Sequence, residues 1–88
     1  MGTFSSPFLN ILPSIDVHGH TRETVIYPVS DFINDNIKLK KDKILIIHGI
    51  GEKILSNQIK ASFSKDKRVK RLYISEENPG CTILELNI

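Results

Sequence analysis

Residues 15–19 read Ile-Asp-Val-His-Gly, and this short stretch decides how the rest of the chain is organised. It is an apolar run that carries two titratable side chains two positions apart and ends in glycine. Residues 44–51, Ile-Leu-Ile-Ile-His-Gly-Ile-Gly, form a second apolar run with His-Gly at the corresponding place. Short apolar runs bounded by turn residues are typical of buried strands. The two runs therefore predict two strands whose ends bring histidines toward a common space.

The segment between these two strands predicts a helix, because its apolar residues recur at helical spacing. One stripe contains Val25, Val29, Phe32, Ile33 and Ile37. Thr21 is predicted as the N-cap of this helix. Pro28 interrupts the stripe, so either the helix is kinked near Val25 or its regular part begins at Pro28. A crossover of helix length makes the two strands parallel and the connection right-handed.

The remaining chain predicts a second helix and then a hairpin. These three elements are expected at residues 52–64, 69–75 and 81–87. A short turn with a Pro-Gly signal joins the last two strands, which makes them antiparallel. Alternation along the third strand predicts Leu72 and Ile74 on one face, with Val69 and Tyr73 on the other.

The order of the predicted elements, β-α-β-α-β-β, predicts a single α/β domain over residues 14–88. Its expected architecture is a two-layer sandwich with a four-stranded mixed sheet. Residues 1–13 are interpreted as an irregular lead-in whose apolar side chains cover one edge of the core. A length of 88 residues, with 40% hydrophobic and 25% charged residues, is typical of one small globular domain.

The composition excludes several functional classes. Cys81 is the single cysteine, which excludes an internal disulfide framework, and no Cys/His spacing matches a structural zinc site. Cys81 itself is interpreted as a small core residue. No apolar run reaches the ~20 residues that a membrane helix needs, and a signal-peptide pattern is absent. A cytoplasmic protein without membrane contact is therefore expected.

The candidate catalytic residues follow the ends of the first two predicted strands. Three parallel strands would place their carboxyl ends at one edge of the sheet, where ligands of open α/β sheets usually bind. Asp16 and His18 alternate onto the same face, and a carboxylate beside an imidazole orients that ring. His48 arrives from the neighbouring strand as a complementary proton-transfer partner. In RNA cleavage, one such group takes the 2′-hydroxyl proton while another protonates the leaving 5′-oxygen.

Two alternatives to this acid–base interpretation stay open. Asp16 could hold a divalent cation such as Mg²⁺ beside the phosphate, which would make cleavage metal-assisted. Asp16 could also have a purely structural role, in which it accepts hydrogen bonds from the backbone amides of the turn that follows its strand.

The same edge has features that suit phosphate groups. Helix starts with nearby glycines present free N–H groups, and glycine allows close approach of the backbone to a ligand. Nucleic-acid contacts are therefore predicted for Gly19, His20, Arg22, Gly49, Gly51 and Lys53. The structural alternative is that the glycines only permit tight strand-to-helix turns.

The positive charge is concentrated away from this edge. The formal net charge is +2, and nine of the twelve lysines and arginines lie in residues 38–43 and 65–71. Both segments are predicted helix-to-strand connectors, so they should lie at the edge opposite the histidines. They are interpreted as solvated connectors, which a long RNA or a ribosome could still touch in a second, salt-sensitive contact.

Three motifs together resemble the Smr (small MutS-related) domain family. They are Ile-Asp-Val-His-Gly at residues 15–19, His-Gly-Ile-Gly at residues 48–51 and Gly-Cys-Thr-Ile-Leu-Glu-Leu at residues 80–86. The first motif in its family form is Leu-Asp-Leu-His-Gly, so Ile15 and Val17 are conservative replacements. The resemblance covers about residues 14–86.

The resemblance implies a fold similar to the C-terminal domain of bacterial translation initiation factor three, in which the last strand inserts between strands two and three. It also implies nucleic-acid binding and often endonuclease activity, since family members nick DNA or cleave mRNA on stalled or collided ribosomes. Asp16 and His18 fall on the positions tied to cleavage, and His48, Gly49 and Gly51 on the second motif.

The function that the resemblance implies for this chain is that of a ribosome-linked RNA endonuclease. The alternatives are structure-specific DNA nicking and a non-catalytic module that binds nucleic acid or the ribosome.

Overall fold

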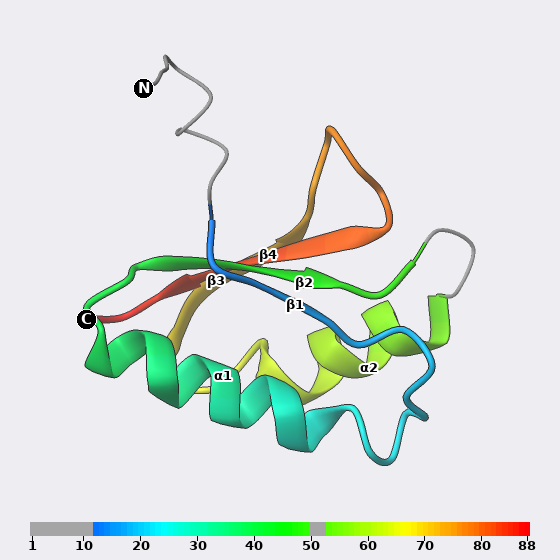
Figure 1. The fold of residues 1–88 in the computed structure, drawn as a ribbon, viewed down its shortest axis with the longest axis horizontal. Helices are drawn as coiled ribbons and strands as arrows, with labels where there is room; N and C mark the ends of the chain where they lie inside the picture. Colours follow the sequence, from blue (N-terminus) through cyan, green and yellow to red (C-terminus); the bar gives the residue numbers. More distant parts are fainter. Residues whose placement is uncertain (1–11, 50–52) are drawn as a thin grey trace.

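In the part of the chain that the structure describes, six elements follow one another in the order β-α-β-α-β-β, as the sequence predicts (Figure 1). The computed structural model describes residues 12–49 and 53–88. The elements are β1 (Ser14–Asp16), α1 (Ile26–Lys38), β2 (Lys43–Ile47), α2 (Lys53–Phe63), β3 (Val69–Ile74) and β4 (Cys81–Leu86). Both helices lie on the same face of the sheet, which gives two layers (Figure 1). Residues 1–11 of the predicted lead-in lie outside the described residues.

The four strands form one mixed sheet in the order β1-β2-β4-β3. β1 and β2 are parallel, and β4 is antiparallel to both of its neighbours. The predicted α/β sandwich is therefore confirmed, as is the insertion of the last strand between the second and third. Since β3 runs parallel to β1 and β2, these three strands end at the same edge of the sheet.

The hydrophobic core lies between the helices and one face of the sheet. Side chains alternate along β2 and β4, so one set of each strand points toward the helices. The two strands contribute Ile44, Ile46, Leu84 and Leu86 to the core, and the two helices contribute Val29, Ile33, Leu55, Ile59 and Phe63. Among the described residues, this one-sided core leaves the other face of the sheet without a helix over it (Figure 1).

The start of α1 differs from the predicted start. Thr21 caps a separate turn, in which its hydroxyl accepts a hydrogen bond from the Thr24 N–H at 3.2 Å. The helix itself begins at Ile26, and Val25 is its N-cap without a side-chain capping bond. The prediction of Thr21 as the cap of this helix was therefore wrong. Pro28 falls in the first turn of α1, where the backbone nitrogen has no intrahelical partner to lose.

The phase of β3 also differs from the predicted phase. Val69 pairs with Leu86 and Arg71 pairs with Glu85, so the register shifts by one residue between them. This irregularity is a β-bulge, and it moves the side chains before it to the opposite face. Val69 therefore lies in the core, and the prediction that it shares a face with Tyr73 was wrong.

Within residues 12–49 and 53–88, neither helix has the length and apolar character that crossing a membrane would require.

Candidate active site

Backbone hydrogen bonds tie the ends of β1 and β2 to each other and to the turn before β4. The Val17 N–H donates to the Ile47 carbonyl at 2.8 Å, which joins the chain after β1 to the end of β2. The N–H groups of His48 and Gly49 both donate to the Gly80 carbonyl at 2.9 Å. The two His-Gly steps are therefore held close to the turn that precedes β4.

Gly19 and Gly49, the glycines of the two His-Gly steps, adopt backbone conformations that disfavour other residues. Gly19 has φ +91° and Gly49 has φ +96°, in the region where an L side chain is strained. Apart from the adjoining residues of the chain, a Cβ atom built on either glycine would meet no atom of the described residues within 4 Å. Backbone conformation, and not close packing, therefore explains why these positions are glycine. Gly51 lies outside the described residues.

Asp16 and His18 form a hydrogen-bonded pair at the end of β1. The Asp16 Oδ1 atom accepts from the His18 backbone N–H at 3.1 Å and lies 2.5 Å from the ring Nδ1. The ring hydrogen bond, followed by the backbone hydrogen bond, lowers the pKa of the Asp16 carboxyl below its ordinary value. The two side chains are 50% and 74% exposed respectively, so solvent and ligands reach them.

The Asp16 carboxylate fixes the tautomer of the His18 ring. A carboxylate only accepts hydrogen bonds, so the ring nitrogen facing it, Nδ1, carries a proton. In the neutral ring, Nε2 is then the basic nitrogen. Within the part of the chain that the structure describes, Nε2 of His18 has no hydrogen-bond partner. The pair therefore presents an oriented, accessible base to a ligand.

His48 has a different environment, because it is only 2% exposed. Its Nδ1 donates to the Gly49 carbonyl at 3.2 Å, since a carbonyl can only accept. Its Nε2 lies 2.8 Å from the Thr82 hydroxyl, which donates to it when the ring is neutral. Both ring nitrogens are thus engaged, and the ring connects the end of β2 to β4.

Thr82 is the residue of this edge that sequence reasoning missed. It is fully buried on the helix-covered face, next to Leu84 in the alternation of β4. A hydroxyl at an inward position of a strand requires a hydrogen-bond partner. That requirement was a usable signal, but the sequence alone does not say that the partner is His48.

The structure brings the two predicted catalytic histidines to one pocket. This pocket has a volume of about 520 Å³ and is lined by His18, Gly19, His20, His48, Gly49 and Leu55. His20 is exposed, and its Nδ1 lies 3.2 Å from the Thr24 hydroxyl. Three of the six predicted nucleic-acid contacts, Gly19, His20 and Gly49, therefore lie in this pocket.

Arg22 and Lys53, the two predicted cationic contacts, do not line the histidine pocket. Arg22 lines a neighbouring pocket that shares His20 and Leu55 with the first. Its Nε donates to Glu23 at 3.2 Å, and this bond lowers the pKa of the Glu23 carboxyl. Lys53 lines a groove between α2 and β3 instead, so it is not brought to the histidines.

The described residues contain no group of three or more His, Cys, Asp or Glu side chains that could hold a metal ion. The basic segments 38–43 and 65–71 lie at the starts of β2 and β3, at the edge opposite the histidines. One member, Arg68, is paired with Asp66 at 2.6 Å and bonded to Asn34 of α1 at 2.9 Å.

Comparison with known proteins gives a consistent match to one family. The family model described as the Smr domain matches residues 15–87. A crystal structure of the Smr domain of Thermus thermophilus MutS2 superposes with a TM-score of 0.81, covering 88% of this chain and 100% of that one. The two share 22% sequence identity, so this likeness concerns the fold.

Two curated relatives carry the name endonuclease MutS2. The protein of Finegoldia magna is 34% identical over 71 residues, which are 81% of this chain and 9% of the relative. The protein of Caldanaerobacter subterraneus subsp. tengcongensis is 32% identical over 81 residues, or 89% of this chain and 10% of the relative. This chain therefore spans about a tenth of the length of these relatives.

Proposed function

The chain belongs to the Smr domain family, and from that premise we propose that it binds nucleic acid and cleaves phosphodiester bonds in RNA. The observation that carries this proposal is the exposed Asp16–His18 pair beside the histidine pocket. The two relatives named endonuclease support the reaction class. The wider proposal, that the substrate is mRNA on a ribosome in the cytoplasm, rests on the family resemblance.

The proposed reaction uses the 2′-hydroxyl of RNA as the nucleophile. Nε2 of His18 takes the 2′-hydroxyl proton, the 2′-oxygen bonds to phosphorus, and the bond from phosphorus to the 5′-oxygen breaks. Asp16 keeps the ring oriented through Nδ1 and stabilises the imidazolium that forms. The products are a 2′,3′-cyclic phosphate and a 5′-hydroxyl.

The leaving 5′-oxygen needs a proton, and two histidines of the pocket are candidates. We assign this role to His20, because its side chain is exposed and lines the same pocket as His18. His48 was the sequence-based candidate, but both of its ring nitrogens are bonded inside the protein. We therefore assign His48 a positioning role, in which it fixes the end of β2 against β4.

Phosphate binding in this proposal relies more on the backbone than on cations. The turns at Gly19 and Gly49 line the pocket, whereas Arg22 is paired with Glu23. A metal-assisted route is the second candidate, with Mg²⁺ bound by Asp16 next to the phosphate. The two routes give different product ends, which separates them experimentally.

The test is cleavage of labelled RNA and of DNA with the same sequence, each with and without EDTA. We expect the wild-type chain to cleave RNA to cyclic-phosphate ends, with little effect of EDTA. His18→Ala should lower the rate by about 100-fold or more, because a general base typically contributes that much. Asp16→Asn should also lower it strongly, whereas Asp31→Asn, an exposed carboxylate on α1, is the matched control and should not.

Three results would change the assignment. Equal cleavage by the wild type, His18→Ala and Asp16→Asn would remove the catalytic role of the pair. EDTA-sensitive cleavage that leaves 5′-phosphate ends would support the metal-assisted route. Binding without cleavage of either substrate would indicate a non-catalytic module, and cleavage of DNA alone would indicate a DNA-nicking domain, for which the 2′-hydroxyl route is not available.

A further inference from the structure

A groove of about 310 Å³ runs between α2 and β3. The wall that α2 forms consists of Lys53, Ser56, Asn57 and Lys60. The wall that β3 and the following turn form consists of Leu72, Tyr73, Ile74 and Pro79. Among the described residues, the lining thus includes two cations and no carboxylate, and Glu77 lines the pocket on the open face of the sheet instead. The groove is cationic along one wall and mainly apolar along the other.

The cationic wall follows from the spacing of its residues along α2. They occupy positions i, i+3, i+4 and i+7 of the helix, so they share one face. Lys53 and Lys60 are two turns apart, or about 10.5 Å at about 1.5 Å per residue. The Ser56 hydroxyl donates to the Lys53 carbonyl at 3.1 Å, so the Asn57 amide is the neutral donor between the two lysines. This face of α2 therefore presents a row of donors over two helical turns.

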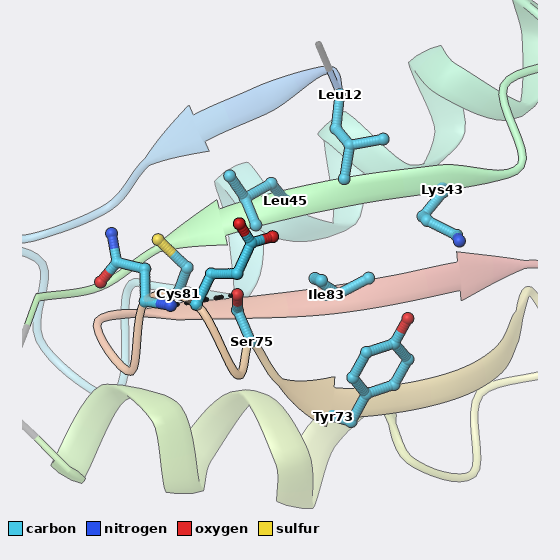
Figure 2. A pocket seen from close by; sticks show the side chains of 9 residues that line it. Leu12, Lys43, Leu45, Tyr73, Ser75, Cys81 and Ile83 are labelled. Atoms are coloured by element: carbon cyan, nitrogen blue, oxygen red, sulfur yellow. Dashed lines mark hydrogen bonds between the residues drawn. The ribbon is translucent and has the colours of Figure 1, made fainter. Parts of the chain in front are cut away.

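The apolar wall follows from the alternation of side chains along β3. Tyr73 pairs with Ile83 of β4, and both side chains lie on the open face of the sheet (Figure 2). Leu72 and Ile74, on either side of Tyr73, therefore project toward α2. Leu72 packs against the core, whereas Ile74 is 45% exposed at the edge of the sheet. The groove thus has an accessible apolar side chain opposite its lysines.

The groove begins at the same edge of the sheet as the histidine pocket. α2 starts at Lys53, and its first turn borders both spaces, since Leu55 lines the histidine pocket. On the other wall, Pro79 precedes Gly80, whose carbonyl anchors the His-Gly step at the end of β2. From this edge the groove extends along α2 toward Lys60. The described residues that line the histidine pocket include no lysine or arginine, so the groove adds cations on one side of it.

We propose that the groove between α2 and β3 binds single-stranded nucleic acid that continues from the histidine pocket, with its phosphates on α2 and its sugars and bases on β3. The proposal rests on the proposed function, because it extends the binding site of the same substrate. With one phosphate per about 3.4 Å of a stacked strand, the distance from Lys53 to Lys60 corresponds to about three phosphate steps. Each nucleotide presents a phosphate and a base, so a strand matches both walls, as in other grooves that bind single strands.

Methyl resonances in NMR spectra of the full chain test where the strand lies. The probe is a 2′-O-methyl RNA of eight nucleotides, which lacks the 2′-hydroxyl nucleophile and therefore stays intact. We expect the Ile74 methyl resonances to shift as this RNA is added. Those of Leu45 and Ile83, on the open face of the sheet, are the matched control and should not shift. Ile74 resonances that stay unchanged, with or without binding elsewhere, would overturn the proposal.

The salt dependence of binding tests the role of the two lysines. Lys53→Gln/Lys60→Gln should weaken binding of the same RNA on the order of tenfold at low salt, and should reduce its salt slope by about 1.4, as two lost contacts with single-stranded phosphates predict. Lys53→Arg/Lys60→Arg keeps both charges and should retain the slope. Fluorescence anisotropy measures each variant, and an unchanged slope in the glutamine variant would argue decisively against the groove.

Cleavage kinetics separate this proposal from the proposed reaction. With a cleavable RNA, Lys53→Gln/Lys60→Gln should raise KM on the order of tenfold and leave kcat nearly unchanged, because the groove binds substrate away from the reacting atoms. His18→Ala should instead lower kcat and leave the Ile74 shift intact. A chain that cleaves nothing but shows the Ile74 shift and the lysine dependence keeps the groove and loses the nuclease. A chain that cleaves RNA without either signature keeps the nuclease and loses the groove.

Two other occupants would be recognised in the same spectra, and either would overturn the proposal. A polyglutamate peptide that shifts Ile74 as strongly as the RNA, at equal concentration and salt, would identify a site for acidic peptides. Ile74 resonances that change with the concentration of the protein alone would identify a second copy of the chain in the groove.

Discussion

The Asp16 carboxylate accepts two hydrogen bonds from His18, so its ionisation reports directly on the proposed catalytic pair. Because these bonds lower its pKa, the pair is stable above the ordinary carboxyl pKa and is lost as the pH falls through the lowered value. We expect His18→Ala to raise the pKa of Asp16 toward its ordinary value, measured by carboxyl carbon NMR. His20→Ala is the matched control and should leave the Asp16 titration unchanged. A titration that is the same in wild type and His18→Ala would contradict the pairing.

The bond between His48 and Thr82 is a separate prediction at this scale. Thr82→Val keeps the shape of the side chain but leaves the buried Nε2 of His48 without its partner, which should lower the free energy of unfolding by about 2 kcal/mol. Thr82→Ser keeps the hydroxyl and removes one methyl group, so we expect a loss of about 1 kcal/mol. Urea denaturation measures both values. If the serine variant were the less stable one, packing of the methyl group would matter more than the hydrogen bond.

Among the elements, α1 ends in a conformation that its sequence does not favour. The Lys41 N–H donates to the Asn36 carbonyl and the Lys40 N–H to the Ile37 carbonyl, which is the Schellman pattern of helix C-termini. Lys40 occupies the left-handed position with φ 61°, where glycine is the usual residue. We expect Lys40→Gly to raise the free energy of unfolding by about 1 kcal/mol. Lys41→Gly, one position later, should give no gain, and an equal gain at both positions would contradict the explanation.

The same helix shows why its middle was predictable and its ends were not. Val29 and Ile33 recur at helical spacing, and this pattern identifies the buried face wherever the helix begins. The sequence has no glycine to mark the C-terminus of the helix. Lys40 adopts the left-handed conformation at that position instead. The start of the helix was predicted wrongly because Thr21 does act as a cap, but of a separate turn before the helix. Local signals of this kind do not specify which turn continues as a helix.

The other features that the sequence did not predict depend on contacts between residues far apart in the chain. The bulge at Val69 depends on how β3 pairs with β4, which no local pattern in β3 records. The candidate site was predictable as far as it is local, since Asp16 and His18 are two residues apart. The hydrogen bond from Thr82 to His48 spans 34 residues and became visible only with the sheet order.

In the molecule as a whole, the candidate active site and most of the positive charge lie at opposite edges of the sheet. The histidine pocket lies at the carboxyl ends of the parallel strands, and lysine-rich segments lie at their other ends. β2 alone has five residues, or about 17 Å at about 3.3 Å per residue, so the two edges are at least that far apart. A ligand must therefore be long to contact both edges, and substrate length becomes a measurable variable.

If nucleic acid binds as proposed, its length should decide whether the lysines matter. With one phosphate per about 3.4 Å of a stacked, helical strand, about five or six nucleotides span the distance between the edges. We expect Lys38→Gln/Lys41→Gln to weaken binding of a 12-nucleotide RNA and to reduce its salt slope by about 1.4, which corresponds to two lost contacts with single-stranded phosphates. The same variant should leave binding of a tetranucleotide unchanged. Arg22→Gln, beside the histidine pocket, should weaken both equally, since both oligonucleotides would occupy that edge. Fluorescence anisotropy at several salt concentrations measures each case, and equal losses for the two lengths in the lysine variant would mean that the two edges do not bind one continuous strand.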